Sequence, residues 1–362
     1  ETAITAVLAI VMTGRSTLVV VPTIDLMQQW EQVLSKYLRA QGQEIKIGLM
    51  GGGVHDPQSI TVATYDSALI HVERLGAKYG LLIFDECHHL PAPQYQFIAM
   101  ASIAPFRLGL SATMERADGR ESVVYDLVGP LLYEAKIQDM VAKVLAPYDV
   151  YSIQVPMNDE EREAYDAARS VYTNFLRRSG IRFNQGADWM QFVRMAGRSP
   201  EGRLAMRAYR EQKRLAQAAS GKLQATWEIL ERHRGEQVIV FTDDNAFAYR
   251  IGREFFVPVL THQTKPKERK AFLEGFRRGD ISVLATSRVL NEGVDVPEAS
   301  IGVVLSGTGT VREHVQRLGR ILRARPGKRA VLYEVIAQGT SEYFVNQRRR
   351  QHDAYQGSTS LP

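Results

Sequence analysis

The chain has 362 residues, of which 45% are hydrophobic and 23% charged, and its formal net charge is +5. This length is enough for two ordinary domains, and these proportions are typical of a soluble globular protein. The single cysteine, Cys87, excludes an intrachain disulfide. No apolar run reaches the roughly 18 residues that a membrane span needs. No basic region precedes the apolar stretch at the start, so we expect no signal peptide and a cytoplasmic protein.

The first part of the chain alternates strand-like and helix-like segments. Strands are predicted at residues 18–23, 45–49, 60–64, 81–84 and 107–113. Helices are predicted at residues 2–10, 24–38 and 94–103. Strands that alternate with helices favour a parallel, doubly wound α/β sheet.

The last part of the chain repeats this plan without a detectable sequence repeat. Strands are predicted at residues 238–241, 257–261, 282–286, 301–305 and 331–336. Helices are predicted at residues 246–255, 266–278 and 311–322. We therefore expect two α/β lobes, each with its own sheet.

An arginine-rich helical segment at about residues 156–220 separates the two lobes, with breaks near Gly180, Gly186 and Ser199. Four arginines lie at i, i+4, i+7 and i+11 and so share one helix face: Arg203, Arg207, Arg210 and Arg214. Aromatic residues interleave with them: Tyr165, Tyr172, Phe175, Phe183, Trp189, Phe192 and Tyr209. Such a stripe is either a solvated face or a nucleic-acid grip, with arginines on phosphates and aromatic rings on bases.

The most informative stretch is residues 81–89, LLIFDECHH. Its apolar run predicts a strand buried on both faces, so the following Asp85 and Glu86 should lie at the carboxyl edge of a parallel sheet. Two adjacent carboxylates repel each other unless a cation or separate roles keep them apart. A nucleoside triphosphate site provides both, with one acid holding Mg²⁺ and the other activating the attacking water.

A second polar constellation lies at residues 313–323. On a helix, Gln316, Arg320 and Arg323 stand at i, i+4 and i+7 and share a face, whereas Arg317 points elsewhere. Arginines placed in this way can neutralise charge on a γ-phosphate.

The phosphate-binding loop G-x-x-x-x-G-K-[ST] that such a site needs occurs nowhere in this sequence. The predicted helix at residues 2–10, followed by a strand, is what should come directly after that loop. We therefore expect the loop to lie upstream of Glu1. The alternative is an ATPase lobe that has lost its nucleotide.

Seven segments carry a resemblance to a known family: residues 18–30 (LVVVPTIDLMQQW), 60–68 (ITVATYDSA), 85–88 (DECH), 111–113 (SAT), 238–243 (VIVFTD), 291–297 (NEGVDVP) and 316–323 (QRLGRILR). In this order they resemble motifs Ia, Ic, II, III, IV, V and VI of the superfamily 2 helicases. The arginine-rich insert resembles the thumb of one branch, the XPB family, in its archaeal and bacterial form. Arg116-Ala117-Asp118 stands where that family carries Arg-Glu-Asp, so Ala117 replaces the glutamate.

This resemblance implies two RecA-like doubly wound parallel-sheet domains, at residues 1–145 and 146–362, with the thumb-like insert inside the second. Motif I and the family's N-terminal damage-recognition region are not in this sequence. The implied activity is that of an ATP-dependent DNA helicase or translocase with ATP and Mg²⁺ as cofactors. Repair or transcription is the implied pathway.

The resemblance also implies roles for individual residues. Asp85 would hold Mg²⁺, Glu86 would act as general base, and His88 would couple the ATP site to Gln316. The residues expected to contact nucleotide from the second domain are Gly293, Asp295, Arg320 and Arg323. Arg116 and Asp118 are candidates for duplex opening.

The DNA path is expected to be lined by Pro22, Thr23, Thr64, Phe241, Thr242 and Ser287, together with the four arginines of the insert. Alternatives remain for some of them, because Pro22 could merely end a strand and Thr64 could merely cap a helix. His89 is expected to be structural, and Cys87 is expected to be a small packed residue.

The expected partner is DNA, as a single strand, fork or duplex, in a nucleoid-associated cytoplasmic setting without a membrane. Archaeal relatives suggest a nuclease as a further partner. The alternative functions are those of a catalytically incomplete DNA-binding scaffold and of the motor subunit of a restriction nuclease.

Overall fold

The computed structural model describes residues 2–40, 43–111, 120–134, 148–181, 186–287, 299–305, 330–342 and 359–360. These residues form two compact units, one up to Glu134 and one from Tyr148 onward. The predicted domain boundary between residues 145 and 146 lies outside the described residues.

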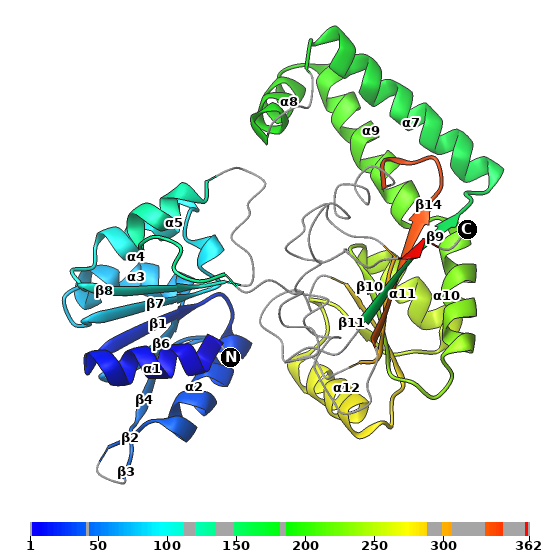
Figure 1. The fold of residues 1–362 in the computed structure, drawn as a ribbon. Helices are drawn as coiled ribbons and strands as arrows, with labels where there is room; N and C mark the ends of the chain where they lie inside the picture. The colour runs from blue at the N-terminus through cyan, green and yellow to red at the C-terminus, as the bar shows by residue number, and fades with distance from the viewer. Residues whose placement is uncertain are drawn as a thin grey trace. The chain divides into compact units, whose positions relative to one another are not determined.

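The first unit contains a parallel sheet with helices on both faces (Figure 1). Its elements are α1 (Thr2–Thr13), β1 (Thr17–Val21), α2 (Ile24–Tyr37), β2 (Arg39–Ala40), β3 (Gln43–Glu44), β4 (Ile47–Gly51), β5 (Val54–Asp56), β6 (Ile60–Thr64), α3 (Tyr65–Leu75), β7 (Leu81–Asp85), η1 (Cys87–His89), α4 (Pro93–Met100), β8 (Phe106–Leu110) and α5 (Ser122–Leu127). Among the described residues the strand order is β5-β4-β6-β1-β7-β8, and only β5 runs antiparallel to its neighbour. The predicted doubly wound sheet is confirmed, whereas β5 and the small β2–β3 hairpin were not predicted.

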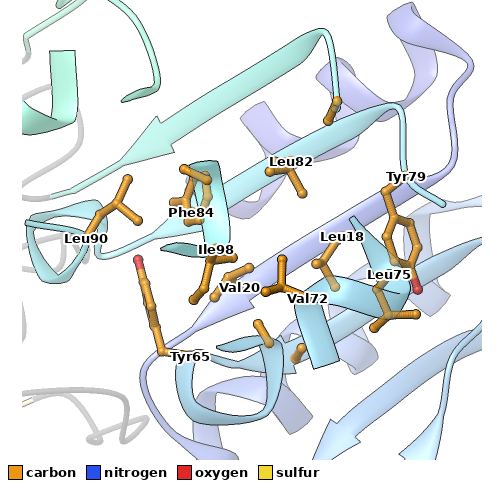
Figure 2. Close-up of a cluster of buried hydrophobic side chains, with 14 of the residues drawn as sticks. Leu18, Val20, Tyr65, Val72, Leu75, Tyr79, Leu82, Phe84, Leu90 and Ile98 are labelled. Carbon is orange, nitrogen blue, oxygen red and sulfur yellow. The ribbon is translucent and has the colours of Figure 1, made fainter. Parts of the chain in front are cut away.

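The two faces of this sheet are built from alternate residues of its central strands. Leu18 and Phe84 face α3 and α4 in one buried cluster, while Val19 and Ile83 face α1 and α2 in another. Successive side chains of a strand point to opposite faces, so an unbroken apolar run fills both layers at once. Figure 2 shows the first cluster, with Tyr65 and Phe84 at one end and Tyr79 at the other. This packing fixes where β7 ends, and therefore where Asp85 stands.

The second unit has a separate core and a second parallel sheet (Figure 1). Its elements are β9 (Tyr148–Val155), α7 (Asp159–Arg178), α8 (Gly186–Arg198), α9 (Pro200–Gln217), α10 (Ser220–Arg232), β10 (Val238–Thr242), α11 (Asn245–Phe255), β11 (Val259–Leu260), α12 (Pro266–Arg278), β12 (Val283–Ser287), β13 (Ile301–Val304), β14 (Ala330–Ala337) and β15 (Thr359–Ser360). The described strands follow the order β11-β12-β10-β13-β14-β9-β15 and all their pairs are parallel. Strands β9 and β15 were not predicted, and the predicted helix at residues 311–322 lies outside the described residues.

The arginine-rich insert is helical, as predicted, and leaves the sheet directly after β9. Helices α7 and α9 run side by side away from the sheet and α8 lies at their far end (Figure 1). Both ends of the insert meet at Glu161, whose carboxylate accepts hydrogen bonds from the backbone N–H groups of Asn158 (3.1 Å) and Ser220 (2.9 Å). The hydroxyl of Tyr165 accepts the backbone N–H of Ser341, 3.0 Å away, beyond the end of β14. These contacts attach the base of the insert to the second sheet.

A buried ion pair connects other elements of the same unit. Lys222 on α10 is fully buried, and its Nζ lies 2.9 and 2.7 Å from the two carboxylate oxygens of Glu342. The same ammonium donates to the carbonyl of Leu305 after β13. A buried charge is tolerated when it is paired and hydrogen-bonded in this way.

Candidate active site

The carboxyl end of β7 places two carboxylates in different environments. Asp85, the last residue of the strand, is 7% exposed, and its Oδ1 accepts the backbone N–H of Glu86 at 3.1 Å. Glu86 adopts a left-handed conformation (φ 48°, ψ 51°) and leads into the turn η1. A non-glycine residue in this conformation costs energy, and such strain is concentrated at functional sites. The side chain of Glu86 is 20% exposed, so it can be reached by a ligand more readily than Asp85.

Two aromatic side chains from different helices hold Asp85 in place. The indole Nε1–H of Trp30 on α2 donates to Oδ2 of Asp85 at 2.7 Å. The hydroxyl of Tyr65, the first residue of α3, donates to the backbone carbonyl of Asp85 at 3.1 Å. Neither residue was predicted to have a role, although both lie within the segments at 18–30 and 60–68 that carry the family resemblance.

The buried position of Asp85 changes its acidity. Burial, with a further contribution from the Glu86 carboxylate, raises the pKa of Asp85 to about 6, against the hydrogen bonds from Trp30 and the Glu86 backbone. Burial disfavours the charged form of an acid. A cation bound beside Asp85 would favour the charged form of this carboxylate and so lower its pKa. The site therefore favours a positive charge next to Asp85.

The residues at the end of β7 fit Mg²⁺. Among the described residues there is no cluster of three or more His, Cys, Asp or Glu side chains able to enclose a metal. Mg²⁺ does not require such a cluster, because it keeps several waters and is commonly bound by one or two carboxylates together with substrate phosphates. Asp85 is the carboxylate placed to hold it, with Glu86 beside it.

His88 connects Glu86 to the next strand. Its Nδ1 lies 3.3 Å from Oε2 of Glu86 and 3.0 Å from Oγ of Ser111, which directly follows β8. The His88 side chain is 1% exposed. The predicted partner Gln316 lies outside the described residues.

The other residues of the turn have packing roles. Burial raises the pKa of the Cys87 thiol to about 12, so this cysteine is not a reactive thiolate. A Cβ on Gly109 of β8 would come within 3.1 Å of the Cys87 sulfur, which shows how closely the two pack. The ring of His89 lies between those of Tyr65 and His88, with centroids 5.9 and 4.4 Å away. The predicted packing roles of Cys87 and His89 agree with this arrangement.

Two predicted DNA contacts of the first unit are helix caps at the same sheet edge. Thr23 caps α2 by accepting the backbone N–H of Leu26 (3.2 Å), and Thr64 caps α3 by accepting that of Ser67 (3.3 Å). Strands β1 and β6, which end beside them, are neighbours, so the amino ends of both helices lie at the carboxyl edge of the sheet. Pro22 links β1 to the Thr23 cap and is half-buried. Capping does not exclude phosphate binding, since helix amino ends attract anions.

A glycine turn that sequence analysis passed over lies at this same edge. Gly51 is the last residue of β4, which pairs with β6, and Gly52 follows it. A Cβ on Gly51 would come within 2.9 Å of Thr64 Cγ2, and one on Gly52, where φ is +59°, within 3.0 Å of Ile24 Cδ1. The triple glycine at 51–53 was the available sign in the sequence, because such turns allow close approach of a backbone or ligand.

The predicted DNA contacts of the second unit also stand at a carboxyl sheet edge. Thr242 ends β10 and Ser287 ends the neighbouring β12, but both are almost fully buried. The Ser287 hydroxyl donates to Oδ1 of Asn245, and the Asn245 amide lies 3.1 Å from Nδ1 of His262. The side chain of Phe241 is 2% exposed and belongs to the protein interior. Any contact of Phe241 with a DNA strand would therefore involve its backbone. Asn245 and His262 are the more accessible polar groups at this edge, and neither was predicted.

The helical insert separates its aromatic rings from its arginine stripe. Arg203, Arg207, Arg210 and Arg214 are all exposed. Five of the six buried residues of α9 occupy the opposite helix face: Gly202, Ala205, Ala208, Gln212 and Ala216. The sixth, Gln217, is the last residue of the helix. Tyr172, Phe192 and Tyr209 pack against one another between the helices, with ring centroids 5.1 to 6.2 Å apart. Arg214 is paired with Glu211, 2.6 Å away, which leaves three arginines of the stripe for other ligands.

Several predicted site residues lie outside the described residues, and their roles stay predictions: Arg116, Asp118, Gly293, Asp295, Gln316, Arg320 and Arg323. Within the described ranges, no helix is long and apolar enough to cross a membrane.

Comparison with protein families finds two matches on this chain. Residues 2–116 match the model of the type III restriction enzyme res subunit, and residues 202–359 match that of the ERCC3/RAD25/XPB C-terminal helicase.

Among curated proteins, the DNA 3'-5' translocase XPB2 of Sulfurisphaera tokodaii is 41% identical over 336 residues, which cover 93% of this chain and 75% of that protein. The DNA 3'-5' helicase XPB of Mycobacterium tuberculosis is 31% identical over 354 residues, 94% of this chain and 57% of that protein. The chain therefore spans little more than half the length of the mycobacterial relative.

Solved structures agree on the fold. A structure of S. cerevisiae Dbp5 bound to RNA and ADP BeF3 matches with a TM-score of 0.63 at 15% identity, covering 96% of this chain and 77% of that one. The helicase domain of Pyrococcus furiosus Hef matches with a TM-score of 0.55 at 18% identity, covering 92% and 89%. The two parallel-sheet units thus have the architecture expected of paired RecA-like domains.

Proposed function

The chain belongs to the XPB family of superfamily 2 DNA helicases, and we propose that it hydrolyses ATP at the carboxyl end of β7 in order to move along DNA. The observation that supports this proposal is the pair Asp85–Glu86, with one carboxylate buried and anchored and the other more accessible. Neighbouring acids with different environments suit two separate roles.

Each acid has a defined task in this proposal. Asp85 holds Mg²⁺, which supplies charge neutralisation for the phosphates of bound ATP. Glu86 accepts the proton of the attacking water. His88, 3.3 Å from the Glu86 carboxylate, orients that carboxylate and transmits its position to Ser111 at the end of β8.

The family resemblance assigns roles to further residues, which lie outside the described ranges. Arg320 and Arg323 neutralise the γ-phosphate, Gln316 senses it through His88, and Gly293 and Asp295 contact the nucleotide. Arg116 and Asp118 take part in duplex opening, a role weakened by Ala117 in place of the family's glutamate.

DNA is bound along the carboxyl edges of the two sheets and by the insert. The capped helix ends at Thr23 and Thr64 and the polar groups near Thr242 and Ser287 contact sugar and phosphate, and exposed arginines of α9 add charge. Following the names of the two relatives, translocation runs 3' to 5'. By family resemblance it serves repair or transcription. A nuclease partner is a further part of this proposal.

Glu86→Gln in the full-length protein tests the assignment. We expect ATP and Mg²⁺ binding to persist and DNA-stimulated turnover to fall by about 10²-fold or more, because only proton transfer is removed. Glu73→Gln on the exposed surface of α3 is the matched control and should behave as wild type. Wild-type-like turnover by Glu86→Gln would refute the role of this carboxylate.

The two alternatives give different results in the same assay. A DNA-binding scaffold would show no DNA-stimulated turnover even in the wild-type protein. A restriction motor would support DNA cleavage together with a nuclease subunit. The match of residues 2–116 to a restriction-enzyme model keeps this second alternative in view, but the relatives that span both units carry XPB names.

A further inference from the structure

The contact between Trp30 and Asp85 has a use beyond packing. Trp30 is 3% exposed and Asp85 7% exposed, and the 2.7 Å bond between the indole nitrogen and Oδ2 joins residues 55 positions apart in the chain. An indole N–H can only donate, and burying it without an acceptor is costly. The contact therefore satisfies the indole, but its geometry also constrains the carboxylate.

Helix α2 brings Trp30 to this position as part of a rigid element. Met27, Trp30 and Leu34 form its buried stripe at i, i+3 and i+7 and pack on the sheet face that includes Val19 and Ile83. The Thr23 cap fixes where the helix begins. The indole is thus held by the core and cannot follow the carboxylate if the latter rotates.

Asp85 is restrained at three points. Trp30 holds Oδ2, the Glu86 backbone N–H holds Oδ1 at 3.1 Å, and the Tyr65 hydroxyl holds the backbone carbonyl. A free carboxylate rotates broadly about its terminal bond, whereas this one has a donor on each oxygen. An ionised carboxylate offers about four lone-pair sites, so both oxygens keep capacity for a metal or a metal-bound water.

We propose that Trp30 is a positioning residue that orients the Asp85 carboxylate toward Mg²⁺. This inference rests on the proposed function, in which Asp85 holds the metal. Partners that orient a metal ligand typically change metal affinity about 10- to 100-fold when they are removed.

The test measures Mg²⁺ dependence of nucleotide binding in the full-length protein, with a fluorescent ATP analogue as the probe. We expect Trp30→Phe to raise the Mg²⁺ concentration for half-saturation about tenfold or more and to leave metal-free nucleotide affinity unchanged. Trp227→Phe, at a tryptophan that is 48% exposed on α10, is the control and should not change either value. A merely structural Trp30 would leave the Mg²⁺ requirement unchanged.

Trp30→Phe removes the hydrogen bond and also makes the ring smaller. A second variant separates these two effects. Replacing Trp30 with 3-benzothienylalanine keeps the bicyclic ring and removes the N–H, so the core stays filled. We expect the same loss of Mg²⁺ affinity as in Trp30→Phe. If both variants have the Mg²⁺ half-saturation of wild type, the inference is overturned.

A spectroscopic readout does not depend on turnover. Each of the three tryptophans in this sequence gives its own indole N–H signal in an ¹⁵N-labelled protein. The Trp30 signal should shift when Mg²⁺ is added to the nucleotide complex, and the Trp227 signal should not. An unmoved Trp30 signal at saturating Mg²⁺ also contradicts the inference.

Asp85→Asn distinguishes this inference from the proposed function. If Asp85→Asn keeps the wild-type Mg²⁺ dependence, the role of Asp85 as metal ligand is wrong. If Asp85→Asn loses that dependence but both Trp30 variants keep it, only the positioning role of Trp30 is wrong.

Discussion

Among single residues, Asp85 is subject to two opposing requirements. Its burial at the end of β7 is unfavourable for a charged side chain, yet a metal-binding role needs that charge. Trp30 and the Glu86 backbone offset part of the cost, and the pKa of Asp85 remains raised, at about 6. Active sites commonly sacrifice stability for function in this way.

The raised pKa predicts how stability depends on pH. The carboxyl group of Asp85 binds its proton more tightly in the folded chain than in the unfolded chain, where its pKa is near 3.8. This tighter proton binding stabilises the folded state. The stabilisation is complete below about pH 4 and is lost as pH rises through about 6. Without nucleotide or Mg²⁺, Asp85→Asn should increase the free energy of unfolding by roughly 1–3 kcal/mol at about pH 7.5 and change it little near pH 4.

Thermal unfolding of wild type and Asp85→Asn at the two pH values checks this prediction. Glu254→Gln, an exposed acid on α11, is the control for the loss of one negative charge. A stability difference that is the same at both pH values would contradict it.

At the scale of elements, helix α9 shows how one amphipathic helix serves two purposes. Its small buried residues, including Ala205 and Ala208, allow close packing, while its arginines line the opposite face. The aromatic rings of the insert pack among its helices, so most of them stabilise the insert rather than bind bases. Any grip on DNA by α9 is therefore electrostatic.

The arginine stripe predicts a particular salt dependence. Changing Arg203, Arg207 and Arg210 together to Gln should weaken DNA binding and flatten the plot of log affinity against log salt concentration by up to about 2–3 units. Each neutralised phosphate contact contributes about 0.7–0.9 to that slope. Arg214 is left in place because Glu211 already pairs with it.

A control for the loss of positive charge removes three exposed arginines from another part of the second unit. Two of them, Arg234 and Arg278, are paired with Glu231 and Asp280. Arg234, Arg253 and Arg278 lie at or just after the ends of helices that lead into strands, and so at the amino-terminal edge of the sheet. Their replacement by Gln should leave the slope near that of wild type. Equal slopes for wild type and the α9 variant would show that the stripe is only a solvated face.

At the scale of the whole molecule, the two units have separate hydrophobic cores. One is built on the sheet of β1 and β7 and the other on the sheet of β10 and β14. Domains with their own cores often unfold as separate cooperative units.

Calorimetry should therefore resolve two unfolding transitions. A variant at a buried residue of one unit should shift only the transition of that unit. Lys222→Met leaves the Glu342 carboxylate without its ammonium and should destabilise the second unit by about 3–5 kcal/mol. Asp85→Asn should shift only the other transition at about pH 7.5. If both variants shift one common transition, the units do not unfold independently.

Local patterns allowed much of the fold and part of the site to be predicted. The apolar run before Asp85 correctly predicted a buried strand ending in two carboxylates, because burial on both faces requires a continuous apolar sequence. The breaks near Gly180 and Ser199 correctly separated the helices of the insert, since glycine and proline interrupt helices. Strand β9 was missed because its partner β14 lies about 180 residues away in the sequence, and no local pattern reports that pairing.

The sequence by itself determined which polar groups this protein carries and in what order: the acidic pair after an apolar strand, the arginine stripe at helical spacing, and the order of the motifs. These features are local, because period and residue type are written in consecutive positions. Only the tertiary structure decided which groups surround Asp85, that Trp30 holds its carboxylate, and that Ser111 lies beside His88. These contacts join residues far apart in the chain, so they exist only once the strands and helices have packed against one another.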